Sequence, residues 1–205
     1  MVRLFIGTFV SQESRDKVLA FQRINAHIKE TAKLRWLPPE KLHLTWNFLG
    51  DVPEGEHPEI LAAMTRALTN FQAEQPQASA LPAVSFSQPT LWPDSRQPRV
   101  FVLRPSETSP TFDRLALLLR GETAKFCRSS DEAKGYAFNP HVTIARTPQN
   151  ERAVKLRLED FVELKNLIPL WLEIAKVELI CSHLGNDAQG YVPLHTFSVN
   201  KLDKA

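Results

Sequence analysis

The stretch LHLTW at residues 42–46 returns 98 residues later, counted from His43 to His141, as PHVTI at residues 140–144. Each copy places a histidine two residues before a threonine, inside an apolar run that is typical of a β-strand. Because side chains alternate across a strand, the histidine and threonine of each copy share one face. The repeat therefore predicts two strands, one from each half of the chain, each with a polar face and an apolar face.

Strand-like runs and helical spacing alternate along the rest of the chain. Strands are predicted at Val2–Val10, Leu34–Leu37, Leu42–Leu49, Ala83–Phe86, Val100–Leu103, His141–Ala145, Leu170–Ser182 and Tyr191–Val199. Helices are predicted from Ser11, an N-cap residue, to about Glu30, and over Pro58–Ala73, Thr111–Phe126 and Arg152–Leu164. No low-complexity tract or long linker divides the chain, so we expect one α+β domain over residues 1–205.

The composition is that of a globular protein without a strong excess of charge. The 205 residues are 43% hydrophobic, enough for a core without disulfides or metals, and 25 basic and 23 acidic residues leave a formal net charge of +2. That balance lacks the basic excess of proteins held on nucleic acid mainly through phosphates, so any RNA contact should be local. Cys127 and Cys181 lack the C-x-x-C spacing of a metal or redox site, which predicts two reduced thiols.

The first residues, MVRLFIGTFV, lack a basic region, a long apolar segment and a small-residue cleavage site. They predict a cytoplasmic protein without membrane attachment, and a monomer is the default expectation.

The two histidines suit phosphodiester hydrolysis, which needs a base for water, an acid for the leaving oxygen and donors for the oxyanion. Imidazole serves both proton roles near neutral pH, since its ordinary pKa is about 6.5. The hydroxyls of Thr45 and Thr143 would sit beside the rings and donate to phosphate oxygens without adding negative charge. We therefore expect His43, Thr45, His141 and Thr143 to form the catalytic set.

Longer blocks carry a resemblance to a known family. RLFIGTFV at residues 3–10, RWLPPEKLHLTWNFLGDV at 35–52, FNPHVTIAR at 138–146 and the terminal KVELICSHL and GYVPLHTFSV resemble the two-histidine phosphoesterase superfamily. Within it, the chain is most similar to the bacterial LigT-like RNA 2',3'-cyclic phosphodiesterases, also described as 2'-5' RNA ligases. The resemblance covers nearly the whole chain.

The resemblance implies a bilobal α+β fold in which two antiparallel sheets, flanked by helices and related by a pseudo-twofold, form a V-shaped cleft. It implies RNA 2',3'-cyclic phosphate ends or nucleoside 2',3'-cyclic phosphates as partners, and neither a metal nor a cofactor. By position, His43 would protonate the leaving 3' oxygen and His141 would activate water, which leaves a 2'-phosphomonoester. Ligation would be the same chemistry in reverse.

Two further residues are candidate substrate ligands. Arg146 matches the family's basic position after the second motif, where its guanidinium would hold the phosphate. A regular strand would turn Arg146 away from His141, so this role requires the strand to end or bulge near Ala145. Phe48 holds the corresponding position after His43 and would stack on a nucleobase, although a core position is an equal alternative.

The other histidines and tryptophans have ordinary structural interpretations. We expect structural roles for His27, His57, His183 and His195, and core positions for Trp36, Trp46 and Trp171. Trp92 differs because it lies in the loop-like, proline-rich stretch 88–99. That stretch either borders the cleft or forms a solvated hairpin loop, and the hairpin loop is the preferred interpretation.

Three alternative functions stay open on the sequence. A metal-dependent hydrolase would use the two histidines as ligands, although no H-E-x-x-H or H-x-D pairing supports it. A non-catalytic module would recognise RNA ends in the same cleft. A phosphodiesterase would act on 2'-5' linked oligonucleotides or small cyclic nucleotides.

Overall fold

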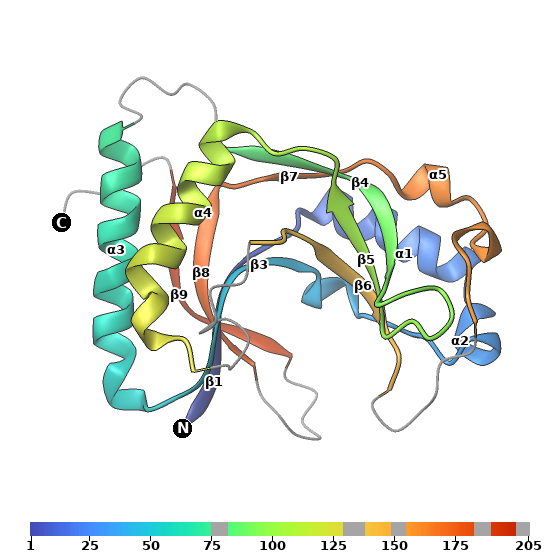
Figure 1. Cartoon of the computed structure of the whole chain (residues 1–205), viewed down its shortest axis with the longest axis horizontal. Helices are drawn as coiled ribbons and strands as arrows, with labels where there is room; N and C mark the ends of the chain where they lie inside the picture. The colour runs from blue at the N-terminus through green and yellow to red at the C-terminus, as the bar shows by residue number, and fades with distance from the viewer. Residues whose placement is uncertain (75–81, 129–137, 149–154, 183–189, 200–205) are drawn as a thin grey trace.

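The computed structural model describes residues 1–74, 82–128, 138–148, 155–182 and 190–199. Within these residues, nine strands form one antiparallel sheet in the order β7-β4-β5-β6-β3-β1-β8-β9, and β2 pairs with β6 (Figure 1). The strands are β1 Val2–Phe9, β2 Arg35–Trp36, β3 His43–Val52, β4 Ala83–Trp92, β5 Val100–Pro105, β6 Val142–Arg146, β7 Leu170–Glu173, β8 Lys176–Ser182 and β9 Tyr191–Ser198. The expected α+β class is confirmed.

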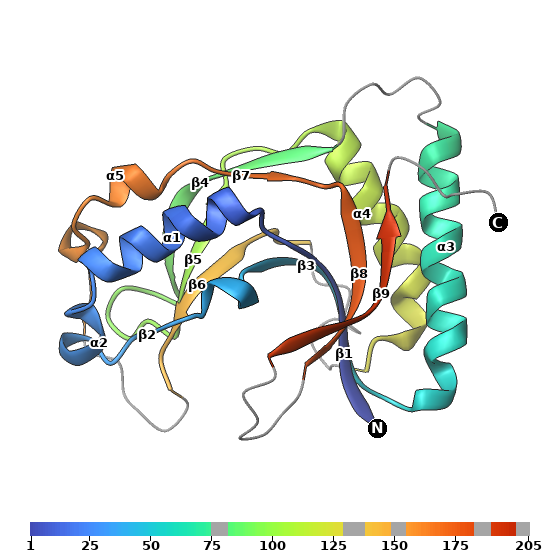
Figure 2. The same cartoon turned by 180° about the vertical axis from the view of Figure 1, so that it is seen from behind.

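Helices pack on both halves of this sheet. The α-helices are α1 Gln12–Ile24, α2 Ile28–Thr31, α3 His57–Glu74, α4 Pro110–Thr123 and α5 Leu164–Leu167, and the 3-10 turns are η1 Pro39–Lys41, η2 Glu54–Glu56, η3 Ala124–Phe126 and η4 Leu158–Asp160. α3 and α4 lie side by side at the β3-β1-β8 half, whereas α1 contacts α5 and β7 at the other half (Figures 1 and 2). None of the helices in the described ranges is long and apolar enough to cross a membrane.

Local sequence explains where the helices begin and what they bury. The side chain of Ser11 accepts a hydrogen bond from the Ser14 amide at 3.2 Å and starts α1, as expected. Ser109 caps α4 in the same way, and Pro110 supplies a first helical residue without an N–H. The buried residues of α3 recur at helical spacing, namely Ile60, Ala63, Met64, Ala67, Leu68 and Phe71.

The two motif strands meet at a narrow joint. Leu44 of β3 pairs with Val142 of β6, and this pair links the β1-β3-β8-β9 half to the β4-β5-β6-β7 half. The two predicted sheets are thus one sheet by strand pairing, which corrects the expected number. The bilobal shape, the V-shaped cleft and the pseudo-twofold stay predictions.

Each motif strand also carries a bulge directly after its threonine. In the β1–β3 ladder Gly7 pairs with Thr45 and Ile6 with Asn47, which leaves Trp46 as the extra residue. In the β5–β6 ladder Val102 pairs with Thr143 and Phe101 with Ala145, which leaves Ile144 as the extra residue. A bulge turns the following side chains relative to a regular strand.

In the described part of residues 152–164, the expected helix is wrong except at Leu164, which begins α5. The Leu156 amide donates to the Ser95 carbonyl at 2.9 Å, and the Phe161 ring stacks on Phe101 with centroids 4.6 Å apart. These contacts hold an irregular segment, interrupted by the 3-10 turn η4, in which Leu156 and Phe161 are buried. Tertiary contacts thus override the local helix propensity. The strand expected over 170–182 is likewise two strands, β7 and β8.

Candidate active site

The motif residues converge at the β3–β6 joint. His43 is the first residue of β3, and His141 immediately precedes β6. Each histidine thus directly precedes one member of the pair Leu44–Val142, which joins the two strands. The two rings are close enough for the charge of His141 to act on the pKa of His43. Because side chains alternate along a strand, the histidine and threonine of each motif lie on the face away from the buried Leu44 and Val142.

Both imidazoles are held by the same backbone contact. Nδ1 of His43 lies 2.6 Å from the carbonyl oxygen of Lys41, and Nδ1 of His141 lies 2.9 Å from that of Asn139. A carbonyl only accepts hydrogen bonds, so Nδ1 is the donor in both rings. In the neutral tautomer Nε2 then carries the lone pair, and it is the atom of each ring that exchanges protons.

Burial keeps both rings neutral in the unliganded protein. His43 is 9% exposed, and its burial lowers the pKa from 6.5 to about 4, against the raising effect of the Lys41 carbonyl. The charges of Arg146 and His141 lower the His43 pKa further. Burial also lowers the pKa of His141, with Arg146 and Arg104 acting in the same direction and the Asn139 carbonyl against them.

Arg146 lies at the exposed end of β6 and acts on both rings. The bulge at Ile144 supplies the change of strand geometry that its predicted role requires. Its positive charge lowers the pKa values of His43 and His141 together. Arg146 is therefore within electrostatic reach of both imidazoles, where a phosphate between them would meet its guanidinium.

Two aromatic rings flank the histidines. Tyr191 stands edge-on to His43 with centroids 5.0 Å apart, and Trp92 stands edge-on to His141 at 4.8 Å. The Lys41 ammonium lies 5.8 Å from the Tyr191 ring centroid, and the Arg104 guanidinium lies 5.9 Å from that of Trp92. The preferred interpretation of residues 88–99 as a solvated hairpin loop is thus wrong for Trp92, which ends β4 beside the site. Sequence reasoning missed Tyr191 and Arg104, which carry no local motif.

Phe48 lies on β3, five residues after His43. It pairs with Phe5 of β1, whose ring centroid is 4.8 Å from that of His43. The Arg3 guanidinium lies 5.8 Å from the Phe48 ring centroid. The half-buried Phe48 thus belongs to the aromatic surround of the site, and its stacking on a nucleobase stays a prediction.

A basic cavity of about 690 Å³ opens beside the joint. It reaches Arg146 and Tyr191 and is lined, among others, by Arg3, Arg35, Trp36, Lys41 and Arg99. None of the described residues that line it is acidic. Among all described residues, no group of three or more His, Cys, Asp or Glu side chains is arranged to hold a metal ion.

The remaining histidines lie elsewhere. His27 precedes α2, His57 begins α3, and His195 of β9 packs its ring on Phe197. His183 lies outside the described residues.

The tryptophans divide between core and surface. Trp46 is fully buried, and its Nε1 donates to Thr8 Oγ1 at 2.8 Å. Trp36 packs edge-on to Phe21 and also lines the basic cavity. Trp171 is 61% exposed, so its predicted core position is wrong. It lies on the edge strand β7, where Leu170 and Leu172 take the inward face and Trp171 the outward face.

Comparisons with known proteins agree with this architecture. The sequence model of the 2'-5' RNA ligase superfamily matches residues 9–186. The RNA 2',3'-cyclic phosphodiesterase of Aquifex aeolicus (strain VF5) is 26% identical over 203 residues, which cover 96% of this chain and 97% of that protein. The protein of the same name from Thermus thermophilus is 28% identical over 207 residues, which cover 92% of this chain and 96% of the relative.

Solved structures share the fold along almost the whole chain. A crystal structure of a Thermus thermophilus protein superposes with a TM-score of 0.67 at 25% identity, covering 97% of this chain and 98% of that one. Escherichia coli LigT in its apo form superposes with a TM-score of 0.65 at 19% identity, covering 96% of each chain. With the family match spanning most of its length, the chain belongs to the 2'-5' RNA ligase superfamily.

Proposed function

We propose that this chain hydrolyses the 2',3'-cyclic phosphate ends of RNA to 2'-phosphomonoesters, with His43 and His141 as its acid and base. One observation carries the proposal. Two imidazoles, each tethered through Nδ1 to a carbonyl two residues earlier, flank the joint at which Leu44 pairs with Val142. Two relatives named RNA 2',3'-cyclic phosphodiesterase support the substrate class.

The chemistry proceeds in one displacement. Nε2 of His141 takes a proton from water as the water oxygen bonds to phosphorus. The bond from phosphorus to the 3' oxygen breaks, and Nε2 of His43 gives that oxygen its proton. Thr45 and Thr143 donate hydrogen bonds to the non-bridging oxygens, and Arg146 balances the charge of the pentacoordinate state. Each proton transfer contributes roughly a hundred- to ten-thousandfold.

Because the pKa of His43 is low, this residue can act as an acid only after bound substrate has raised that pKa. In the free protein the ring has a pKa of about 4, so it is neutral at pH 7. Burial and the nearby positive charge of Arg146 lower that pKa, and a bound phosphodiester anion opposes the effect of this charge. Binding of the phosphate therefore raises the pKa of His43, so that the ring takes up the proton that it later donates. A protonated imidazole in a buried site is a strong acid.

The same residues would catalyse the same displacement with a different nucleophile. A 5' hydroxyl in place of water would yield a 2'-5' phosphodiester, and cleavage of that linkage would return the cyclic phosphate. The ligase activity and action on 2'-5' linked oligonucleotides follow from one set of proton transfers.

The test offers purified protein a set of oligonucleotides ending in 2',3'-cyclic phosphate, with and without excess EDTA, and identifies the products by ³¹P NMR. We expect 2'-phosphate ends at equal rates in both conditions. A 3'-phosphate product would overturn the assignment of acid and base. Loss of activity in EDTA would favour a metal-dependent hydrolase, and tight binding without turnover would favour a non-catalytic RNA-end module.

A further inference from the structure

The basic cavity beside the joint concentrates positive charge in a chain that is nearly neutral. Five of its lining residues are basic, namely Arg3, Arg35, Lys41, Arg99 and Arg146. The whole chain has a formal net charge of only +2. Arg3 lies 3.6 Å from Asp51, which partly neutralises its charge. Such a local excess attracts a polyanion to this place.

Strand pairing brings three of these arginines together. Arg35 of β2 pairs directly with Arg146 of β6, and Arg99 precedes Val100, the partner of Arg146 in β5. The Thr147 amide also donates to the Arg99 carbonyl at 2.9 Å, which fixes Arg99 beside this pair. Three exposed arginines thus occupy neighbouring positions on the wall of the cavity.

Some residues that line the cavity also act on the proposed catalytic pair. Arg146 lines it and lowers the pKa of both His43 and His141. Lys41 also lines it, while its carbonyl oxygen holds His43 Nδ1 at 2.6 Å. The rings of Trp36 and Tyr191 lie among the cations, and bases of single strands stack on such rings. A chain entering here would reach the imidazoles through Arg146.

A free cyclic mononucleotide carries one phosphate, which the imidazoles, the threonines and Arg146 would already surround. The rest of the cavity, which Arg35, Lys41 and Arg99 line, would still have room for further phosphates. We infer that these three residues bind the internucleotide phosphates of the RNA strand immediately 5' to its cyclic end. The preferred substrate is accordingly an oligonucleotide rather than a small cyclic nucleotide. This inference rests on the proposed function for the identity of the reacting end.

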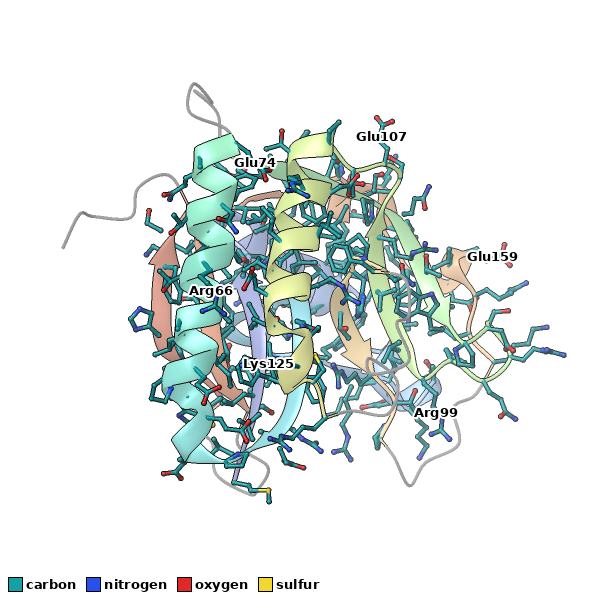
Figure 3. All side chains as sticks on the ribbon, turned by 60° about the vertical axis from the view of Figure 1, so that its left-hand side comes forward. Arg66, Glu74, Arg99, Glu107, Lys125 and Glu159 are labelled. Carbon is teal, nitrogen blue, oxygen red and sulfur yellow. The ribbon has the colours of Figure 1, made fainter. Side chains whose placement is uncertain are left out.

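The experiment separates strand binding from chemistry. Binding is measured by fluorescence anisotropy with a six-nucleotide RNA ending in a 2'-phosphate, which is not turned over, from 50 to 300 mM salt. Catalysis is measured as kcat/KM for the cyclic-phosphate oligonucleotide and for 2',3'-cyclic AMP. Both assays compare the wild type with Arg35→Gln, Arg99→Gln and the double variant. Arg66→Gln removes the same charge from α3, across the molecule from Arg99 (Figure 3).

We expect each of the two cavity substitutions to weaken binding of the RNA about tenfold. The slope of log Kd against log salt should fall by about 0.7 for each phosphate that is no longer neutralised. The ratio of kcat/KM for the oligonucleotide to that for 2',3'-cyclic AMP should fall by a similar factor, and Arg66→Gln should resemble the wild type. Equal binding by the wild type and the double variant, or equal weakening by Arg66→Gln, would overturn the inference. Absence of turnover with intact, salt-sensitive binding would instead overturn the proposed function alone.

Discussion

Leu44 of β3 pairs with Val142 of β6, and each is directly preceded by the histidine of its motif. This pair brings His43 and His141, which are 98 residues apart in the sequence, to one joint between the two halves of the sheet. Neither motif forms the proposed site by itself, because the proposed acid and base come from different strands. The register of this short joint decides whether both rings reach one phosphorus atom.

Replacing either histidine should remove most of the activity. We expect His43→Ala and His141→Ala each to lower kcat about 10²- to 10⁴-fold, because each removes one proton transfer. The double variant should lose far less than the product of the two, since acid and base act in one transition state. Single-turnover kinetics on a cyclic-phosphate oligonucleotide measure this. His27→Ala is the control, since His27 is exposed before α2. Full activity in either site variant would exclude a catalytic role for the substituted histidine.

The buried imidazole of His43 should make folding stability depend on pH. Its folded pKa of about 4 lies below the unfolded value of 6.5, so the unfolded chain binds more protons between these limits. The contribution of the neutral ring is complete above pH 6.5 and is lost as pH falls through about 4. The difference corresponds to about 3 kcal/mol.

Urea unfolding at pH 7 and pH 4 tests this dependence. The free energy of unfolding of His43→Gln should fall by about 3 kcal/mol less than that of the wild type over this range. Other groups titrate in both proteins and cancel in the comparison. His195→Gln, on the exposed face of β9, should follow the wild type. Parallel curves for His43→Gln and the wild type would contradict the burial of a neutral ring.

Arg146 should govern the proton affinity of both histidines as well as the affinity for phosphate. Because its charge lowers both pKa values, Arg146→Gln should raise the pKa of His43 and of His141. Removal of a charge-assisted hydrogen bond to the phosphate should also raise KM about 10- to 100-fold. NMR titration of the ring protons measures the first effect, and steady-state kinetics the second.

Arg104→Gln distinguishes this role from a general effect of charge. Arg104 lowers the pKa of His141 and is not among the causes of the His43 shift. Its removal should therefore raise the His141 pKa and leave that of His43 in place. A shift of both rings in Arg104→Gln, or of one ring in Arg146→Gln, would show that the site geometry differs.

The parts of this site that were predictable from the sequence are the local ones. Two-residue periodicity alone sets the histidine and threonine of LHLTW and PHVTI on one face of each strand. The orientation of Arg146 depends on a bulge at Ile144, which exists only in the ladder with β5. Tyr191 and Trp92 reach the histidines from β9 and β4, so no spacing along the chain predicts them.

Tertiary contacts also overrode local helical preference. Residues 155–163 contain good helix formers, yet the Leu156 amide bonds to Ser95 and Phe161 packs against Phe21 and Phe101. Likewise α1 buries Phe21 but leaves the equally apolar Ile24 45% exposed. Which apolar residue of a helix is buried depends on the partner surface, and that surface was assembled from distant strands.

A substitution at Gly7 tests how the packing of β1 against the first motif affects the site. It pairs with Thr45 in the β1–β3 ladder. A Cβ at this position would lie 3.0 Å from the Leu44 carbonyl oxygen, 3.0 Å from Phe5 Cε2 and 3.2 Å from Ile180 Cδ1. The Leu44 carbonyl belongs to the motif backbone, and the Phe5 ring packs on His43, so relief of the clash at either of these atoms shifts a neighbour of His43.

We therefore expect Gly7→Ala to lower the free energy of unfolding by about 1–3 kcal/mol and to lower kcat as well. Gly121→Ala is the matched control, because a Cβ on this α4 residue meets nothing within 4 Å. An alanine there should stabilise the helix by about 0.5–1 kcal/mol without changing kcat. Urea unfolding and steady-state kinetics on both variants separate the effects. Unchanged kcat in a destabilised Gly7→Ala protein would mean that the strain is absorbed away from His43.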